Sequence, residues 1–295
     1  MKKRWLRFFA FVFLWGSIPI LLILAIQENG TLKIENETSL EEFLPFYVAM
    51  YVQEDFEKEN IKAMAVICRS NLKEMIRKDD KKISNMKAAY RMVYKEMYIK
   101  RKKIYQNVIE ACKETTGEVL KYNGSVCYCP FFYMSSGTTR DAFAIFKEHK
   151  YPYLISVPSY KDELCDKYVS YHYFSSNDFI NVEIEKKNEK TSIDGNNQEN
   201  DKYKNLLQVL ECDQSGYVLW IKVGNQILGG ERFREKYGLS SSCFTIEENE
   251  NQIRIICKGK GHGFGYSQYG ANEMAKDGSD YHNLLKHYFP LLNIE

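Results

Sequence analysis

Alternating glycines near the C-terminal end form the stretch of this sequence whose residue types best suit a binding site. Between Lys258 and Ala275 the chain reads KGKGHGFGYSQYGANEMA, with glycine at every second position from 259 to 265. Because glycine adopts positive φ and has no side chain, another chain can approach such a backbone closely. Polar and aromatic side chains suited to sugars lie in and after the glycines: His262, Tyr266, Ser267, Gln268 and Tyr269. We therefore predict that this segment binds an extended ligand.

A nucleotide-binding loop is the alternative interpretation of the same glycines. They follow an expected strand, residues 251–257, and precede an expected helix, as a dinucleotide-binding loop does. However, the spacing is G-x-G-x-G, and the few dozen residues that remain are too few for the rest of a nucleotide domain. These two features favour a sugar over a nucleotide.

Charge argues against nucleic acid as a partner. Four of the 41 basic residues lie within the first seven positions, so the rest of the chain carries 37 basic against 39 acidic residues. No basic stripe interleaved with aromatic residues occurs, and the run KRKK at 100–103 is typical of a solvated helix face.

The N-terminus has the pattern of a membrane anchor. Basic residues precede an uncharged run from Phe8 to Gln27, whose roughly 20 residues at ~1.5 Å each match the ~30 Å hydrocarbon core. Cations before this run predict positive-inside insertion, with residues 28–295 outside the cytoplasm. A cleaved signal peptide is the alternative, but its apolar region typically spans only about 7 to 15 residues and ends in small residues.

Helical periodicity dominates the first half of residues 28–295, the part expected outside the cytoplasm. Apolar residues recur every three or four positions from residue 55 to about 78 and again from 84 to about 115, which predicts two helices that pack together. The apolar stretch 43–52 fits either a helix or a strand.

Short apolar runs separated by turns follow. The Asn123-Gly124 dipeptide between runs 119–122 and 126–133 predicts a hairpin. Further strands are expected at 153–157, 216–223 and 243–246, with a short helix at 233–239. Residues 185–205 are polar and aperiodic, which predicts a flexible surface insertion. Helices followed by strands indicate an α+β fold.

The glycine segment also resembles a known family. GKGHGFGYSQYGANEMAKDG, followed by YHNLLKHYF at 281–289, resembles the C-terminal signature of the SpoIID/LytB domain family, typified by stage II sporulation protein D. Residues 40–70, 117–140 and 229–245 are similar to other segments of that family. The resemblance implies one mixed SpoIID-like domain over 28–295. It also adds Ser136 and Arg234 to the residues expected to bind glycan.

This resemblance implies lytic transglycosylation of peptidoglycan by a membrane-anchored protein of spore engulfment. In that reaction a glutamic acid protonates the glycosidic oxygen and the sugar's own 6-hydroxyl closes an anhydro ring. The implied ligands are glycan strands, and the implied partners are cell-wall hydrolases or proteins of an engulfment complex. A single carboxyl suffices here, unlike ordinary glycoside hydrolysis, which uses two.

The sequence departs from the family at the acid itself. The resemblance places the catalytic glutamate at Tyr51, and a phenol with a reference pKa of ~10 is a poor proton donor for this chemistry at pH 7. The nearest carboxyl, Glu54, lies one turn further along if the segment is helical. Two hypotheses follow: a transglycosylase that uses Glu54, and a catalytically silent relative that binds glycan as a scaffold.

A metal site is the second implication of the resemblance. Some members hold zinc near the central turn through His and Cys, and Tyr133 stands where the histidine is expected. Cys127, Cys129 and Cys165 lie close by in the sequence alignment. They are compatible with an incomplete zinc set, or with a disulfide between Cys165 and one of the other two.

Overall fold

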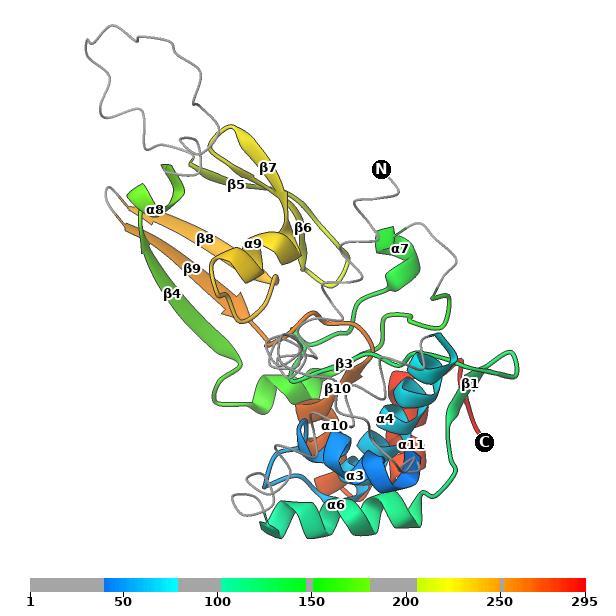
Figure 1. The fold of residues 1–295 in the computed structure, drawn as a ribbon. Coiled ribbons are helices and arrows are strands. Elements are labelled where there is room, and N and C mark those ends of the chain that lie inside the picture. The colour runs from blue at the N-terminus through cyan, green and yellow to red at the C-terminus, as the bar shows by residue number, and fades with distance from the viewer. Residues whose placement is uncertain (1–39, 79–101, 147–150, 181–205, 250–251) are drawn as a thin grey trace, which may run out of the picture. The chain divides into compact units, whose positions relative to one another are not determined.

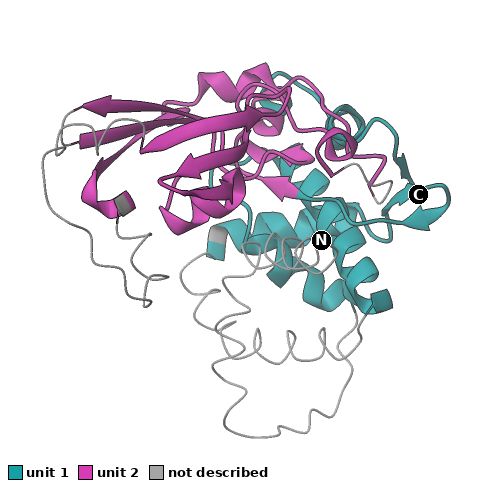
Figure 2. Ribbon diagram, turned by 90° about the horizontal axis from the view of Figure 1, so that it is seen from above, with its two compact units in different colours: residues 1–130, 275–295 teal, residues 131–274 magenta. Residues whose placement is uncertain are grey.

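The computed structural model describes residues 40–78, 102–146, 151–180, 206–249 and 252–295 (Figure 1). The chain separates into two compact units, residues 1–130 with 275–295 and residues 131–274 (Figure 2). The expected anchor at 8–27 and the insertion at 185–205 lie outside the described residues. No helix in the described ranges is both long and apolar enough to span a membrane.

The core of the first unit contains four helices among the residues that the structure describes. They are α3 (Leu40–Ala49), α4 (Lys58–Lys78), α6 (Lys102–Glu114) and α11 (Tyr281–Tyr288). Helix α4 packs against the other three, so its apolar residues lie in the centre of this core. The predicted helix at 55–78 is confirmed with a start at Lys58, and its packing against the next helix is confirmed for the described part, α6. The stretch 43–52 is helical as far as Ala49.

A buried arginine ties these helices together. The Arg69 side chain on α4 is fully buried, and its guanidinium donates to the Glu41 carboxylate of α3 at 2.8 and 3.1 Å. The same group donates to the Cys112 carbonyl at 3.0 Å, in the last turn of α6. A cation is favourable there because the C-terminal carbonyls of a helix carry partial negative charge. Arg69 therefore fixes α3 and α6 on α4.

The predicted hairpin is present in the first unit. It consists of β1 (Leu120–Tyr122) and β2 (Ser125–Val126), and β11 (Asn293–Ile294) pairs with the other side of β1. Asn123 and Gly124 have φ of 49° and 77°, and two consecutive positive φ values match the twist of antiparallel strands. The second run is shorter than the expected 126–133, because only Ser125 and Val126 pair with β1.

The second unit holds two three-stranded antiparallel sheets (Figure 1). One has the order β4 (Val169–Ser175), β9 (Gln252–Lys258), β8 (Phe244–Asn249), and the other β5 (Leu207–Cys212), β6 (Val218–Val223), β7 (Gln226–Gly229). Helix α9 (Gly230–Lys236) contacts β6 and β7, and its Phe233 joins a buried cluster with residues of both sheets, among them Ile221 and Ile255. The expected strands at 216–223, 243–246 and 251–257 are confirmed, and the short helix expected at 233–239 is present three residues earlier, as α9.

Shorter elements complete this unit. A two-stranded parallel pair joins β3 (Phe131–Phe132) to β10 (Tyr266–Ser267). The remaining helices are α7 (Ala142–Phe146), the 3₁₀ helix η1 (Tyr160–Leu164), α8 (Asn177–Ile180) and α10 (Gln268–Lys276). With helices first and a β-rich part after them, the described chain confirms the expected α+β class.

The strand predicted at 153–157 is wrong. This segment contains no strand, and only an isolated bridge joins Thr138 to Pro158. The backbone groups of Val157 bond to Thr139 instead. The Thr139 N–H donates to the Val157 carbonyl at 2.9 Å, and the Val157 N–H donates to the Thr139 hydroxyl at 2.9 Å. The run is apolar because Tyr153, Leu154 and Val157 are buried, not because it belongs to a sheet.

Candidate functional site

The glycine segment packs against its own protein chain. Four of its glycines have positive φ, between 77° and 121°: Gly259, Gly261, Gly263 and Gly265. A Cβ on Gly259 would lie 2.7 Å from the Ser135 carbonyl oxygen, and one on Gly263 would lie 2.6 Å from Cζ of Tyr217. Both distances are shorter than van der Waals contact. The glycines are needed for internal close packing, so the prediction that they open the backbone to a ligand is wrong at these positions.

Backbone hydrogen bonds hold this segment on both sides. Lys260 and Met134 exchange two bonds, of 2.7 and 3.1 Å, and the Gly261 N–H donates to the Ser240 carbonyl at 2.9 Å. Next along the chain, the Arg140 N–H donates to the Gly263 carbonyl at 2.8 Å. The segment thus links the stretch 131–140 to the loop before β8.

Three of the predicted glycan contacts lie inside the second unit. Tyr266 and Ser267 are fully buried and Gln268 is 5% exposed. The Ser267 hydroxyl lies 2.8 Å from both carboxylate oxygens of Asp162, which also accepts from the Ser159 hydroxyl at 2.8 Å. Burial raises the pKa of Asp162, although these hydrogen bonds oppose the shift. These side chains hold the 3₁₀ helix η1 against β10 and offer little surface to a ligand.

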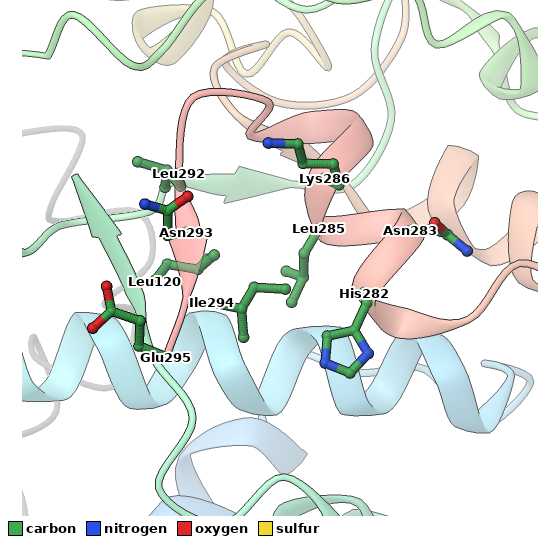
Figure 3. A pocket seen from close by; sticks show the side chains of 9 residues that line it. All are labelled: Leu120, His282, Asn283, Leu285, Lys286, Leu292, Asn293, Ile294 and Glu295. Carbon is green, nitrogen blue, oxygen red and sulfur yellow. The ribbon is translucent and has the colours of Figure 1, made fainter. Parts of the chain in front are cut away.

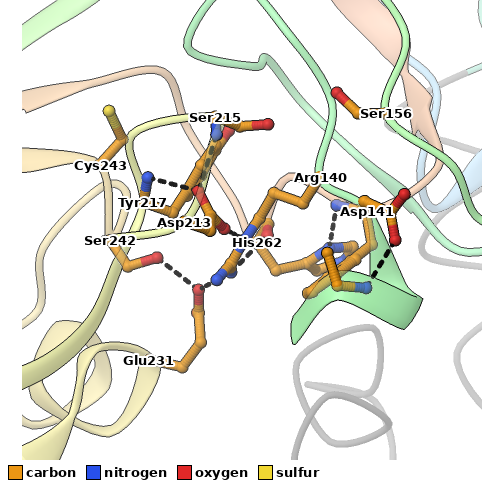
Figure 4. A network of polar contacts seen from close by, with 12 residues as sticks. Arg140, Asp141, Ser156, Asp213, Ser215, Tyr217, Glu231, Ser242, Cys243 and His262 are labelled. Atoms are coloured by element: carbon orange, nitrogen blue, oxygen red, sulfur yellow. Dashed lines mark hydrogen bonds and ion pairs between the residues drawn. The ribbon is translucent and has the colours of Figure 1, made fainter. Parts of the chain in front are cut away.

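Arg140 is the centre of a buried polar network (Figure 4). Its guanidinium is 2.6 Å from the Asp213 carboxylate and 2.8 Å from the Glu231 carboxylate, and it donates to the His262 carbonyl at 3.2 Å. The guanidinium also lies 4.7 Å from the ring centroids of Tyr217 and Phe264. A planar cation that is both paired and stacked in this way fixes the surrounding loops firmly.

Glu231 extends the network to helix α9. Its second oxygen pairs with Arg234 at 2.8 Å, and the Ser242 hydroxyl donates to the first. Burial raises the pKa of Glu231, but the charges of Arg234 and Arg140 outweigh that effect and leave the pKa below its ordinary value. Arg234 is itself only 4% exposed. The arginine expected to bind glycan is therefore a buried partner of Glu231.

His262 is half-buried between two aromatic rings. Its ring centroid is 5.5 Å from that of Phe132 and 6.0 Å from that of Phe264. Nδ1 accepts the Phe264 N–H at 3.1 Å. Burial lowers the pKa of His262 to about 4, with Arg234 and Arg140 adding to the effect and Glu231 opposing it. The imidazole is thus neutral at pH 7 and suits hydrogen bonding better than proton donation.

Tyr269, which was predicted to bind glycan, remains partly accessible and lies beside Tyr133. The two half-buried rings have centroids 6.2 Å apart, and the exposed Lys260 places Nζ 5.4 Å from the Tyr133 centroid. Burial raises the pKa of Tyr269 to about 12, so its hydroxyl stays neutral. We call Tyr133, Tyr269 and Lys260 the tyrosine platform. Aromatic faces beside a cation suit a sugar ring that carries an anionic group.

Ser136 contributes less than expected to such a surface. It is half-buried, its hydroxyl donates to the Ser215 carbonyl at 3.1 Å, and its N–H donates to the Tyr217 hydroxyl at 3.2 Å. Its polar groups are thus engaged in holding the turn after β3.

In the first unit, the position expected to hold the acid lies just after α3. The Tyr51 N–H donates to the Val48 carbonyl at 2.9 Å, and its half-buried ring meets Tyr47 edge-on at 5.2 Å between centroids. Burial raises the pKa of Tyr47, which Tyr51 reinforces. Glu54 is exposed on a turn, because the helix has already ended at Ala49. The helical placement assumed for Glu54 is therefore wrong.

The structure does not support the expected zinc set. Cys127 and Cys129 are buried with their sulfurs 4.0 Å apart, and the Asn71 amide binds both backbone groups of Cys129, at 2.7 and 2.9 Å. Burial raises the pKa of the Cys129 thiol, which disfavours the thiolate that zinc requires. Within the described ranges, no three His, Cys, Asp or Glu side chains are arranged to hold a metal. Neither of the disulfides considered with Cys165 is present, since all these cysteines are free.

Arg140, Asp213 and Glu231, which form the buried network, could not be recognised from the sequence. Asp213 lies 73 positions after Arg140 and Glu231 lies 91 positions after it, so no local spacing connects these residues. These residues lie in loops and in helix α9, so no strand pattern marks them either.

Comparison with known proteins shows a family match in the N-terminal part and distant relatives over most of the chain. Residues 28–122 match the SpoIID family, described as stage II sporulation protein. The chain is 28% identical to stage II sporulation protein D of Bacillus amyloliquefaciens over 274 residues, which cover 89% of this chain and 75% of that protein. It is 26% identical to the Bacillus subtilis protein of the same name, over 92% of this chain and 77% of that one.

A shorter likeness points to the same group. A stretch of 50 residues is 42% identical to the amidase enhancer of Bacillus subtilis, covering 17% of this chain and 7% of that protein. The chain is therefore a distant relative of stage II sporulation protein D, and its residues 28–122 match the SpoIID family.

Proposed function

We propose that this protein binds the glycan strands of peptidoglycan during spore engulfment, as a membrane-anchored scaffold that cuts them slowly or not at all. Residues 8–27 serve as the anchor, and residues 28–295 lie outside the cytoplasm. Partners of the scaffold are cell-wall hydrolases or other engulfment proteins. The match to the SpoIID family supports the cell-wall setting, and the tyrosine platform supplies aromatic faces and a cation for a sugar strand.

One observation carries the proposal that catalysis is weak or absent. Tyr51 occupies the position at which the family resemblance implies the acid, and its ring packs edge-on against Tyr47. A transglycosylase acid must be protonated near neutral pH, which requires a carboxyl in a desolvated setting. Glu54 is exposed on a turn. Neither residue meets that requirement as it stands.

Substitution of the tyrosine platform tests the binding part. Tyr133→Ala should weaken binding to purified, peptide-free glycan strands about three- to tenfold, since stacking against one ring contributes roughly 0.5–1.5 kcal/mol. Tyr160→Ala is the matched control, because Tyr160 belongs to the same unit and is 66% exposed. Binding measured by co-sedimentation or calorimetry that falls equally in both variants would contradict the platform.

Lytic transglycosylation with Glu54 as the acid is the second candidate. The resemblance to a lytic family favours it, and Glu54 is exposed on the turn that follows Tyr51. In that case the wild type cleaves glycan and Glu54→Gln abolishes cleavage while leaving binding intact.

A further inference from the structure

A pocket of about 510 Å³ opens in the first unit beside the C-terminal strand (Figure 3). Helix α11 lines one side through His282, Leu285 and Lys286. The segment around β11 lines the other through Leu292 and Ile294. A volume in the range of ~300–1,000 Å³ is typical of ligand sites. None of the residues that line it is used in the proposed function.

The pocket combines an apolar floor with a polar rim. Leu120, Leu285 and Leu292 are each at most 2% exposed and form the floor. His282 and Lys286 are exposed at the rim, and Figure 3 shows Ile294, Leu285 and His282 turned toward the same space. Such a lining fits an aliphatic side chain with a polar group next to it.

The rim is electrostatically selective. Glu295, the carboxylate on the β11 side, is paired with Lys121 at 2.7 Å. Lys286 donates to the Pro290 carbonyl at 2.8 Å, and no carboxylate among the described side chains lies within salt-bridge distance of it. His282 has the Glu118 carboxylate at 3.8 Å. Lys286 is thus the lining cation that no described carboxylate neutralises, so an anionic group can pair with it directly.

A backbone edge runs beside the same pocket. Within the described strands, β11 pairs with β1 on one side only. Val119 and Glu295 exchange two hydrogen bonds, of 2.9 and 3.0 Å, so they form a bonded pair. Because bonded and non-bonded pairs alternate in an antiparallel ladder, the N–H and C=O of Ile294 face away from β1. An extended chain can pair with such an edge.

We propose that this pocket binds an extended acidic peptide segment of a partner protein. The peptide main chain pairs with β11 at Ile294, an aliphatic side chain enters the pocket, and an Asp or Glu carboxylate lies against Lys286. This interaction goes beyond glycan binding, because it requires a peptide main chain.

Fluorescence anisotropy with two blocked, fluorescein-labelled hexapeptides tests the proposal on the full chain in detergent. The acidic probe is Thr-Val-Leu-Asp-Val-Thr, and the matched probe has Lys in place of Asp. We expect the acidic probe to bind about tenfold more tightly than the basic one, with the difference shrinking at high salt. Lys286→Glu should weaken the acidic probe about fivefold or more. Lys102→Glu, an exposed lysine outside the pocket, should leave it unchanged.

A second variant separates the backbone contact from the charge. Ile294→Pro removes an N–H that faces away from β1, so it should weaken the acidic probe while Ile294→Val does not. Equal binding of the two probes, binding unaffected by Lys286→Glu, or no binding by the wild type would overturn the proposal. Glycan binding is measured separately with peptide-free strands, so failure here leaves the proposed function unaffected.

Discussion

His262 shows how burial changes the chemistry of a residue predicted to bind glycan. Its pKa of about 4 lies below the ordinary 6.5, so the unfolded state binds a proton in the window between these values and the folded state does not. The stability that the neutral ring contributes is complete above pH 6.5 and is lost as the pH falls toward 4. Each pH unit within that window changes the free energy of unfolding by about 1.4 kcal/mol at most.

We therefore expect His262→Gln to lose part of the acid sensitivity of the wild type. Between pH 7 and pH 5 the unfolding free energy of the wild type should fall by about 2 kcal/mol more than that of the variant, measured by urea denaturation. His282→Gln serves as the control, since His282 is exposed. Parallel pH profiles for wild type and His262→Gln would show that the ring is not held neutral.

The glycines of the segment 258–275 allow close packing between neighbouring elements of the fold. Gly263→Ala places a Cβ 2.6 Å from Tyr217 and 2.8 Å from Arg140 Cδ, beside the buried network. We expect a loss of about 3–5 kcal/mol, or failure to fold, because side chain and backbone must both shift. Gly238→Ala is the matched control, because Gly238 has a similar φ of 64° and no atom lies within 4 Å of the added Cβ. It should lose only about 1–2 kcal/mol from backbone strain. Equal losses in thermal unfolding would contradict close packing at Gly263.

Elements set by local rules could be predicted from the sequence. Helix α4 follows from apolar residues at helical spacing, and the hairpin follows from Asn123-Gly124, since both depend on residues close in the chain. The run 153–157 shows the limit of such patterns, because apolar residues signal burial without specifying a sheet. In this run the Val157 N–H bonds to the side-chain hydroxyl of Thr139 and not to a neighbouring strand.

The candidate site was harder to predict for the same reason. Residue types suited to sugars were recognised around the glycines, but Ser267 and Arg234 have partners, Asp162 and Glu231, that only the fold identifies. The structure retains Tyr269 as an accessible member and adds Tyr133, whose backbone carbonyl accepts the Tyr269 N–H at 2.9 Å. Side-chain pairing across distant segments determines which polar residues face solvent.

At the scale of the whole molecule, the proposed orientation follows from the N-terminal cations and the uncharged run after them. Protease added to intact protoplasts should digest residues 28–295, because the proposed orientation puts this part outside the cytoplasm. Full protection of the chain until the membrane is permeabilised would reverse the orientation.

For the whole protein we propose that glycan is bound without efficient cleavage, because Tyr51 stands at the position of the acid. The most direct measurement is incubation of the purified protein with peptide-free glycan strands, followed by mass spectrometry of the products. We expect the wild type to bind the strands and to release few or no anhydro-sugar products, while Tyr51→Glu gains cleavage because its carboxyl lies beside the buried Val48 and Val52. Abundant anhydro products from the wild type, lost in Glu54→Gln, would contradict the claim and identify an active transglycosylase.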